Sequence, residues 1–248
     1  YKAEQPSGPG MDVGPRNPVS EPVIDGTPSF MADLSTLSSS GNWHVAYGDG
    51  VFVAVAYDSA RAVYSIDHGK TWTAVSLPSS AYWNYVTYGD GVFVVVALAG
   101  SKAAYSNNGG KTWVASTLPS SARWGAIVYG DGTFVAMVAG ESVAAYSVDR
   151  GKTWNALTLP SVEGGWHYIA YGDGVFVIAK ADSTNVAYST DKGGTWTEAT
   201  LPLSVSWMGL TYGDGVFVLM SYGDKSGYRV EHGQTWNAVT LSSVAKRH

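Results

Sequence analysis

An eight-residue box, Ser-x-Asp-x-Gly-x-Thr-Trp, recurs four times with little change and a fifth time in a worn copy that begins at Arg229. It places carboxylates at regular intervals, where metal binding or acid–base chemistry is the first possibility. Its third residue is acidic or an amide in every copy: Asp67, Asn108, Asp149, Asp191 and Glu231. Such a side chain accepts hydrogen bonds from backbone N–H groups two residues on and thereby holds a turn. We therefore expect turn-stabilising residues, with no metal site and no catalytic residue among them.

Ten Trp residues follow the same repeat, two in each copy. One closes the box, and the other opens the copy beside a loop that differs between copies. The five leading residues are Trp43, Trp83, Trp124, Trp166 and Trp207. Two interpretations stay open for them: packing between repeat units, or a ring of aromatic platforms against which sugar rings stack with their C–H faces.

Under the second interpretation, polar and aromatic neighbours of these Trp residues would contact the sugar hydroxyls. The predicted glycan-binding set then contains the five leading Trp residues together with His44, Tyr57, Arg61, Tyr82, Asn84, Arg123 and His167. No cofactor is predicted.

An enzyme is not expected from the carboxylates that remain. A glycosidase needs two carboxyl groups that flank one bond, and the loop carboxylates are scattered without a pairing pattern: Asp58, Glu141, Glu163, Asp182 and Asp224. No Ser-His-Asp arrangement, phosphate-binding Gly-rich loop or metal-spaced His pair accompanies them. The sequence therefore predicts a protein without catalytic activity.

The spacing of the leading Trp residues, 40, 41, 42 and 41 positions, indicates an array of supersecondary units. The third copy predicts four strands, which we name a to d: 124–129, 133–139, 142–147 and 153–159. Asp131-Gly132 is a two-residue hairpin turn between strands a and b, because Gly supplies positive φ cheaply. Five such units predict an all-β fold, a five-bladed β-propeller of four-stranded antiparallel blades near residues 43–78, 83–119, 124–160, 166–202 and 207–241.

A propeller separates its connections onto two faces. The a–b turns and the boxes, which lie between strands c and d, share one face and hardly vary, whereas the b–c and d–a loops share the other face and differ between copies. Binding sites are usually built from variable loops on a rigid scaffold, so we place the site on the second face. We expect the blades to close on themselves. Residues 31–43 echo the stretch 71–83, which suggests the remnant of a further copy.

The boxes resemble the Asp-box, or BNR, repeat of sialidase-type and other propellers, and the resemblance covers residues 43–241. It implies that the boxes are folding devices on the blade rim, away from ligands. The sialidase arginine triad is missing, since only Arg61 and Arg123 fall on the variable face. The repeats also resemble those of bacteriophage tail and fibre proteins and of lectin-type propellers, and, less closely, those of Ycf48-like assembly factors.

The composition of the chain excludes two classes of binding partner. The formal net charge is −5 and no basic run occurs, so nucleic acid is not expected. No apolar stretch is long enough for membrane insertion, and Cys is absent.

Residues 1–28 hold six of the ten Pro residues, which favours an extended arm or linker, either without fixed structure or docked on a neighbouring subunit. Residues 29–248 form the second region.

We therefore expect a glycan-binding, receptor-recognition propeller, by resemblance a component of a phage virion or an extracellular protein. Its predicted partners are a cell-surface glycan and, through residues 1–28, neighbouring virion subunits. The alternative is a structural subunit that uses the propeller as a protein-interaction surface and binds no small ligand.

Overall fold

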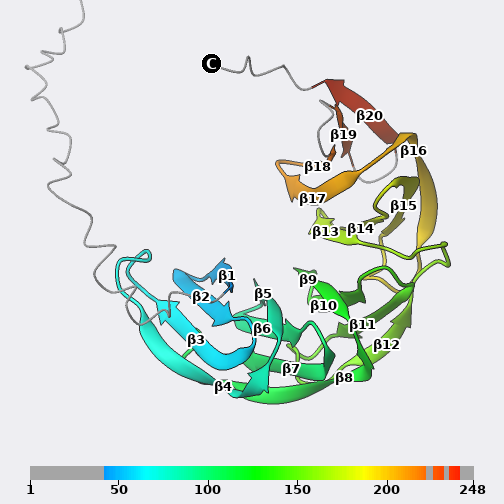
Figure 1. Ribbon diagram of the computed structural model, residues 1–248. Coiled ribbons are helices and arrows are strands. Elements are labelled where there is room, and N and C mark those ends of the chain that lie inside the picture. The colour runs from blue at the N-terminus through cyan, green and yellow to red at the C-terminus, as the bar shows by residue number, and fades with distance from the viewer. Residues whose placement is uncertain (1–41, 222–225, 232–234, 241–248) are drawn as a thin grey trace, which may run out of the picture.

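The computed structural model describes residues 42–221, 226–231 and 235–240, and every regular element in them is a strand. Twenty strands form five four-stranded sheets, which follow one another along an arc (Figure 1). Each sheet is one predicted blade with four antiparallel strands in sequence order. Strand a lies at the inner side of the arc, and strand d lies at the outer side. The predicted arm, residues 1–28, and the echo at 31–41 lie outside the described residues.

The strands of blade 3, the copy whose strands were predicted, begin and end close to the predicted positions. Blade 1 contains β1 (Trp43–Gly48), β2 (Val51–Ala56), β3 (Ser59–Ser65) and β4 (Thr73–Ala81). Blade 2 contains β5 (Trp83–Gly89), β6 (Val92–Ala97), β7 (Gly100–Ser106) and β8 (Val114–Ala122). Blade 3 contains β9 (Trp124–Gly130), β10 (Thr133–Val138), β11 (Val143–Ser147) and β12 (Asn155–Thr158).

The last two blades repeat this order. Blade 4 contains β13 (Tyr168–Gly172), β14 (Val175–Ala179), β15 (Ser183–Ser189) and β16 (Thr197–Val205). Blade 5 contains β17 (Trp207–Gly213), β18 (Val216–Ser221), β19 (Ser226–Glu231) and β20 (Thr235–Thr240).

The a–b hairpin turns have the backbone that the Asp-Gly dipeptide predicts. At Asp49 and Gly50, φ is 49° and 77°, and both turn residues have positive φ in the other four blades as well. A turn of this kind matches the right-handed twist of the strands that it joins. Residues 49–50 therefore fix the register of β1 against β2, with Gly48 opposite Val51.

The core lies between the blades. Four clusters of buried apolar side chains fill the four seams between neighbouring blades, and strand b supplies both sides of each seam. In β6, for example, Phe93 and Val95 face blade 1 while Val94 and Val96 face blade 3. Strand b is therefore apolar at nearly every position, because both of its faces are covered.

The expected closure is not observed within the described part of the chain. Blades 1 and 5 stand apart across the opening of the arc, whereas each of the other blade pairs is joined through its inner strands (Figure 1). The reason is geometric: the seam between two blades fixes the turn from one blade to the next, and four such seams do not complete a circle.

Candidate functional site

The boxes form one face of the arc and repeat the same hydrogen bonds. In the third box, the Ser147 hydroxyl donates to Asp149 Oδ1 at 2.9 Å and accepts the Gly151 N–H at 2.9 Å. Asp149 also accepts the N–H and the hydroxyl of Thr153, at 2.9 and 2.7 Å. The carboxylate is thus fully used in closing the turn, as predicted for a structural role.

These hydrogen bonds act on the acidity of the box carboxyl groups. Bonds from the hydroxyl and N–H of Thr71, followed by the Ser65 hydroxyl, lower the pKa of Asp67 to about 2. The N–H and hydroxyl of Thr195 lower the pKa of Asp191 to about 2 in the same way. A carboxyl group that is held ionised by its own turn is a poor general acid or base near neutral pH.

In the third and fourth boxes, the fourth residue joins the box to the preceding blade. Arg150 in the third box pairs with Asp90 in the a–b turn of blade 2 at 2.7 Å, and Lys192 in the fourth box pairs with Asp131 of blade 3 at 3.1 Å. Both pairs are exposed, so each contributes little to stability. They nevertheless show that the spacing of turn and box aligns opposite charges across these two seams.

The leading Trp residues lie between the blades and not on a surface. Trp83, Trp124, Trp166 and Trp207 are at most 1% exposed and belong one to each of the four seam clusters. Their indole N–H groups donate to backbone carbonyl oxygens, as Trp83 does to Ser79 at 3.0 Å. The platform interpretation is therefore wrong for these four, because a sugar cannot reach a buried ring. Trp43, which belongs to the first of the described blades, is half-buried.

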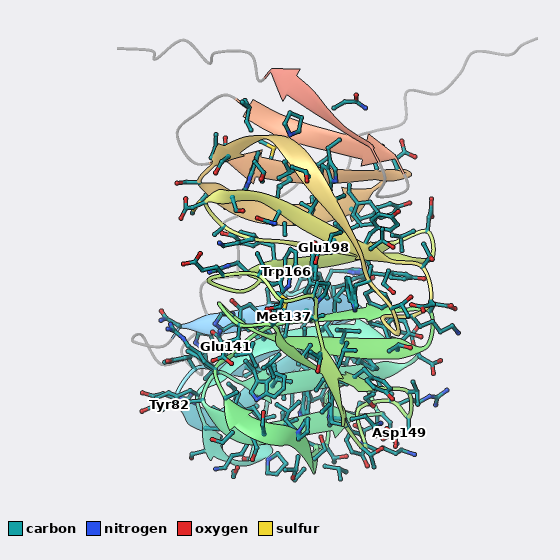
Figure 2. All side chains as sticks on the ribbon, turned by 90° about the vertical axis from the view of Figure 1, so that its right-hand side faces the viewer. Tyr82, Met137, Glu141, Asp149, Trp166 and Glu198 are labelled. Carbon is teal, nitrogen blue, oxygen red and sulfur yellow. The ribbon has the colours of Figure 1, made fainter. Side chains whose placement is uncertain are left out.

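Other predicted residues form aromatic pairs across the seam between blades 1 and 2. The rings of Tyr57 and Tyr82 lie 5.3 Å apart, and those of His44 and Tyr85 lie 5.7 Å apart. Tyr82 is 50% exposed and lies on the side of the arc opposite to Asp149 (Figure 2). We call these four residues the aromatic patch. Burial lowers the pKa of His44, which favours a neutral imidazole in the patch.

Sequence reasoning had not included Tyr85 in the set, although its position two residues after a leading Trp could have indicated it. Asn84 is half-buried beside the patch, and Arg61 is exposed on β3 of the same blade as Tyr57. Arg123 and His167 belong to later seams, and the His167 Nδ1 atom accepts the Ala181 N–H at 3.4 Å. The predicted set is therefore divided between several seams.

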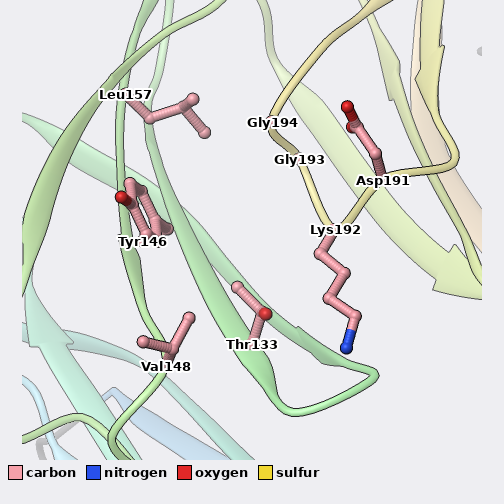
Figure 3. Close-up of a pocket in the computed structure, with 8 residues that line it drawn as sticks. All are labelled: Thr133, Tyr146, Val148, Leu157, Asp191, Lys192, Gly193 and Gly194. Atoms are coloured by element: carbon pink, nitrogen blue, oxygen red, sulfur yellow. The ribbon is translucent and has the colours of Figure 1, made fainter.

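A pocket of about 290 Å³ lies on the other side, where the fourth box meets blade 3 (Figure 3). It is lined by Thr133, Tyr146, Val148, Leu157, Asp191, Lys192, Gly193 and Gly194. The Thr133 hydroxyl is buried there without a hydrogen-bond partner in the described structure. The other blades have Val at this position (Val51, Val92, Val175 and Val216), so the exception was visible in the sequence.

The pocket exists because the fourth box lies further from the preceding blade than the second and third boxes do. A Cβ placed on Gly193 would be 3.7 Å from Val135, whereas Cβ atoms on Gly110 and Gly151 would be 2.6 and 2.8 Å from the corresponding Val side chains. Its volume is at the small end of ligand pockets, which usually begin near 300 Å³. It suits at most a small molecule.

Among the described residues, no group of three or more His, Cys, Asp or Glu side chains could hold a metal ion. None of the described segments forms a helix that is long and apolar enough to cross a bilayer. The loop carboxylates Asp58, Glu141, Glu163 and Asp182 are exposed and lie on different loops, and Asp224 is outside the described residues.

Comparisons with known proteins agree with the fold. The BNR/Asp-box repeat family matches residues 63–74, which contain the first box. No curated protein matches the sequence. A catalytically inactive virginiamycin B lyase from Staphylococcus aureus, solved with quinupristin, is similar in structure with a TM-score of 0.69 at 16% identity, covering 82% of this chain and 71% of the lyase.

Two further solved structures resemble the chain. A streptogramin B lyase has a TM-score of 0.69 at 14% identity and covers 83% of this chain and 70% of its own. YCF48 bound to a D1 peptide has a TM-score of 0.64 at 18% identity and covers 81% of this chain and 67% of its own. At such identities the likeness establishes the fold alone.

The prediction that the chain is not an enzyme is contradicted by these structures, because proteins with this fold include a lyase. The absence of familiar catalytic motifs was the wrong criterion, since a propeller can assemble a site from residues on separate blades. What the repeats, the sheets and the comparisons establish together is that the chain carries BNR/Asp-box repeats on a β-propeller fold.

Proposed function

We propose that the chain binds glycans through the face that carries the b–c and d–a loops, with the aromatic patch as the contact surface. The observation that supports this most directly is the Tyr57–Tyr82 pair, whose rings lie 5.3 Å apart with Tyr82 half exposed. An aromatic side chain in this position adds little to the core and offers a flat apolar surface to a ligand.

The chemistry around the patch suits a sugar. The C–H face of a pyranose would stack on the Tyr82 ring. Its hydroxyls would bond to Asn84, two positions further along the chain, and to Arg61, which is exposed on β3 of the blade that carries Tyr57. Ligand sites commonly combine an apolar surface with a few polar groups that fix orientation. No second seam repeats the two aromatic pairs, so within the described residues we propose one such site and not the ring of sites that the repeat suggested.

A glycan array incubated with the full-length chain is the first test, followed by titration of a retained glycan. We expect Tyr82→Ala to weaken binding at least about tenfold, because the stacking surface is lost, and to leave the thermal midpoint unchanged. Ile66→Ala, an exposed apolar position on the box face, is the matched control and should bind as the unmodified chain does. An array without any retained glycan, or a Tyr82→Ala variant of normal affinity, would end the proposal.

A protein-interaction surface is the second candidate. It is favoured by two exposed apolar side chains, Leu203 on β16 of blade 4 and Met208 on β17 of blade 5, which are 54% and 59% exposed. A structure with this fold is described as bound to a peptide. Exposed apolar side chains that gather at one place often mark contacts between proteins. Met208→Asp would weaken such a contact and leave glycan binding unchanged.

The virion or extracellular location, and the docking of residues 1–28 on a neighbouring subunit, remain predictions. They depend on the resemblance of the repeats to phage tail and fibre proteins.

A further inference from the structure

The pocket between the fourth box and blade 3 lies on the box face and is separate from the aromatic patch (Figure 3). Two blades supply its walls: β10, β11, β12 and Val148 contribute from blade 3, and residues 191–194 contribute from blade 4. Its volume of about 290 Å³ corresponds to about ten water molecules at roughly 30 Å³ each. The space is therefore large enough for a ring with one polar substituent.

The seam beside the pocket is closed in the same way as the other seams. In each seam a Tyr of strand a covers a Gly at the end of strand a in the preceding blade, and a Cβ on that Gly would overlap the ring. We call this the tyrosine-on-glycine contact. The four pairs are Tyr88 on Gly48, Tyr129 on Gly89, Tyr171 on Gly130 and Tyr212 on Gly172. Because Tyr171 covers Gly130 at the seam of the pocket, the two blades are not separated there, and the gap belongs to the box alone.

Thr133 supplies a hydrogen-bonding group that the fold does not use. The residue is 1% exposed, and its hydroxyl has no hydrogen-bond partner among the described residues. The position is Val in the other four blades, so a residue of nearly the same shape without a hydroxyl suits the seam. A buried hydroxyl without a partner is destabilising. Figure 3 shows the hydroxyl oxygen on the side of Thr133 that faces Lys192 and the fourth box.

The blade 3 side of the pocket is apolar. Val148, Leu157 and the Tyr146 ring lie there, across the pocket from the box residues (Figure 3). On the box side, Asp191 already accepts the Ser189 hydroxyl and both the N–H and the hydroxyl of Thr195. The pocket therefore combines an apolar wall with one unused polar group, which is a common composition of small-molecule sites.

The charges at the pocket oppose one another. Lys192 pairs with Asp131 at 3.1 Å, and both side chains are more than half exposed. Because the pair is close to neutral, it favours neither an anion nor a cation. An exposed ion pair contributes little free energy, so the Lys192 side chain can move aside at low cost and give a ligand access to Thr133.

We propose that this pocket binds a neutral small molecule that has an apolar ring or chain and one hydroxyl or carbonyl group. The apolar part lies against Leu157 and Val148, and the polar group forms a hydrogen bond with the Thr133 hydroxyl. A hydroxyl both donates and accepts, so Thr133 is satisfied by an alcohol or by a carbonyl compound. The site is independent of glycan binding on the other face.

Benzyl alcohol is the probe, because it joins an aromatic ring to one hydroxyl group. Toluene lacks the hydroxyl, and benzoate and benzylammonium carry a negative and a positive charge on the same ring. Each probe is titrated into the full-length chain and followed by the NMR signals of the methyl groups. We expect benzyl alcohol to shift the signals of Val148 and Leu157, and both charged probes to bind more weakly than benzyl alcohol.

Thr133→Val is the decisive variant, because it removes the hydroxyl and introduces the residue of the other four blades. We expect the affinity for benzyl alcohol to fall about fivefold through loss of the hydrogen bond. The affinity for toluene should stay the same, and the thermal midpoint should stay the same or rise. A merely structural Thr133 would not change the ratio of the two affinities.

Val148→Trp is the second variant, since its larger side chain would fill the pocket from an exposed position. We expect it to abolish binding of every probe. The matched control is Ile66→Trp, the same position of the first box and equally exposed, which should leave binding unchanged.

Three results would overturn the proposal. The first is that no probe shifts Val148 and Leu157, in which case the pocket holds water alone. The second is that Thr133→Val weakens benzyl alcohol and toluene equally or changes neither. The third is that benzoate or benzylammonium binds more tightly than benzyl alcohol.

Discussion

On the box face, three hydrogen bonds recur in four blades: from the Ser hydroxyl to the Asp or Asn Oδ1, from the Thr N–H to the same oxygen, and from the Gly N–H to the Ser Oγ. The last of these is 2.9 Å long in each of the four boxes. On the loop face, the leading indole N–H groups use three kinds of acceptor: the carbonyl four residues earlier for Trp83 and Trp124, the carbonyl 24 residues earlier for Trp124 and Trp207, and the carbonyl of Pro160 for Trp166. Both faces belong to the same strands.

The difference teaches where sequence variation is tolerated. A box residue serves a turn and a seam at once, so changing it disturbs the fold. A loop residue such as Tyr82 is held by a scaffold that does not depend on it, and this freedom is what permits a binding surface to arise. Repetition marks the residues that the fold requires, and variation marks those that are available for function.

Trp124→Ala should have the largest effect and tests whether a repeated residue beside the loop face belongs to the fold. Trp124 is fully buried in the seam between blades 2 and 3, so its removal leaves a large cavity. We expect a loss of about 3–5 kcal/mol in the free energy of unfolding, measured by urea denaturation. A Trp124→Ala protein of unchanged stability that no longer bound glycan would contradict this, because it would show that a repeated Trp serves binding and not the fold.

Gly89→Ala should come next. Its methyl group would overlap the Tyr129 ring, and the seam must open to accept it, at a cost of about 2–3 kcal/mol. The matched control is Gly213→Ala, the same substitution at the equivalent position in blade 5, where we expect a change within about 0.5 kcal/mol. Equal effects of the two substitutions in denaturation experiments would show that seam packing does not restrict this glycine.

Asp149→Ala should cost about 1 kcal/mol, because the N–H of Thr153 loses its partner but is exposed to water. Asp149→Asn should cost less, since Asn108 closes the second box with the same bond from Thr112 N–H at 3.0 Å. Neither variant should change glycan affinity. A loss of binding by either variant would place function on the box face.

Acid should produce the smallest effect. The pKa values of Asp67 and Asp191 fall from 3.8 to about 2 on folding, so these groups stabilise the folded state when ionised. Their contribution is complete above about pH 4, where the unfolded chain is also ionised, and is lost as the pH falls towards 2. We expect the thermal midpoint to fall by a few degrees between pH 4 and pH 2, less so when Asp67 is replaced by Asn. A constant midpoint over this range would contradict the hydrogen-bonded box.

Much of the fold could be predicted because its signals are local. The two residues Asp131-Gly132 are enough to specify a hairpin turn, and the eight residues of a box are enough to specify the turn between strands c and d. The strands of blade 3 were therefore predicted nearly to the residue. Local geometry repeated five times was then sufficient for the architecture.

The candidate site was harder, because burial depends on the next blade. The sequence around a Trp that begins strand a is the same whether the side chain packs against a neighbouring sheet or contacts a ligand. Only the packing of one blade on the next determines that Trp124 is buried and that Tyr82 is exposed. The open ends of the arc were not predictable for the same reason. Thr133 could have been noticed as the one departure from Val, but nothing in the sequence indicated that the neighbouring box lies further away.

The tyrosine-on-glycine contact has a consequence for how such a chain evolves. Each stretch of about 41 residues encodes a sheet together with both halves of the interface that joins it to its neighbours. A single in-frame duplication of this stretch therefore adds a blade that already fits, without any compensating mutation. Gain or loss of whole repeats is then a small genetic step, and the number of blades can change faster than their sequence.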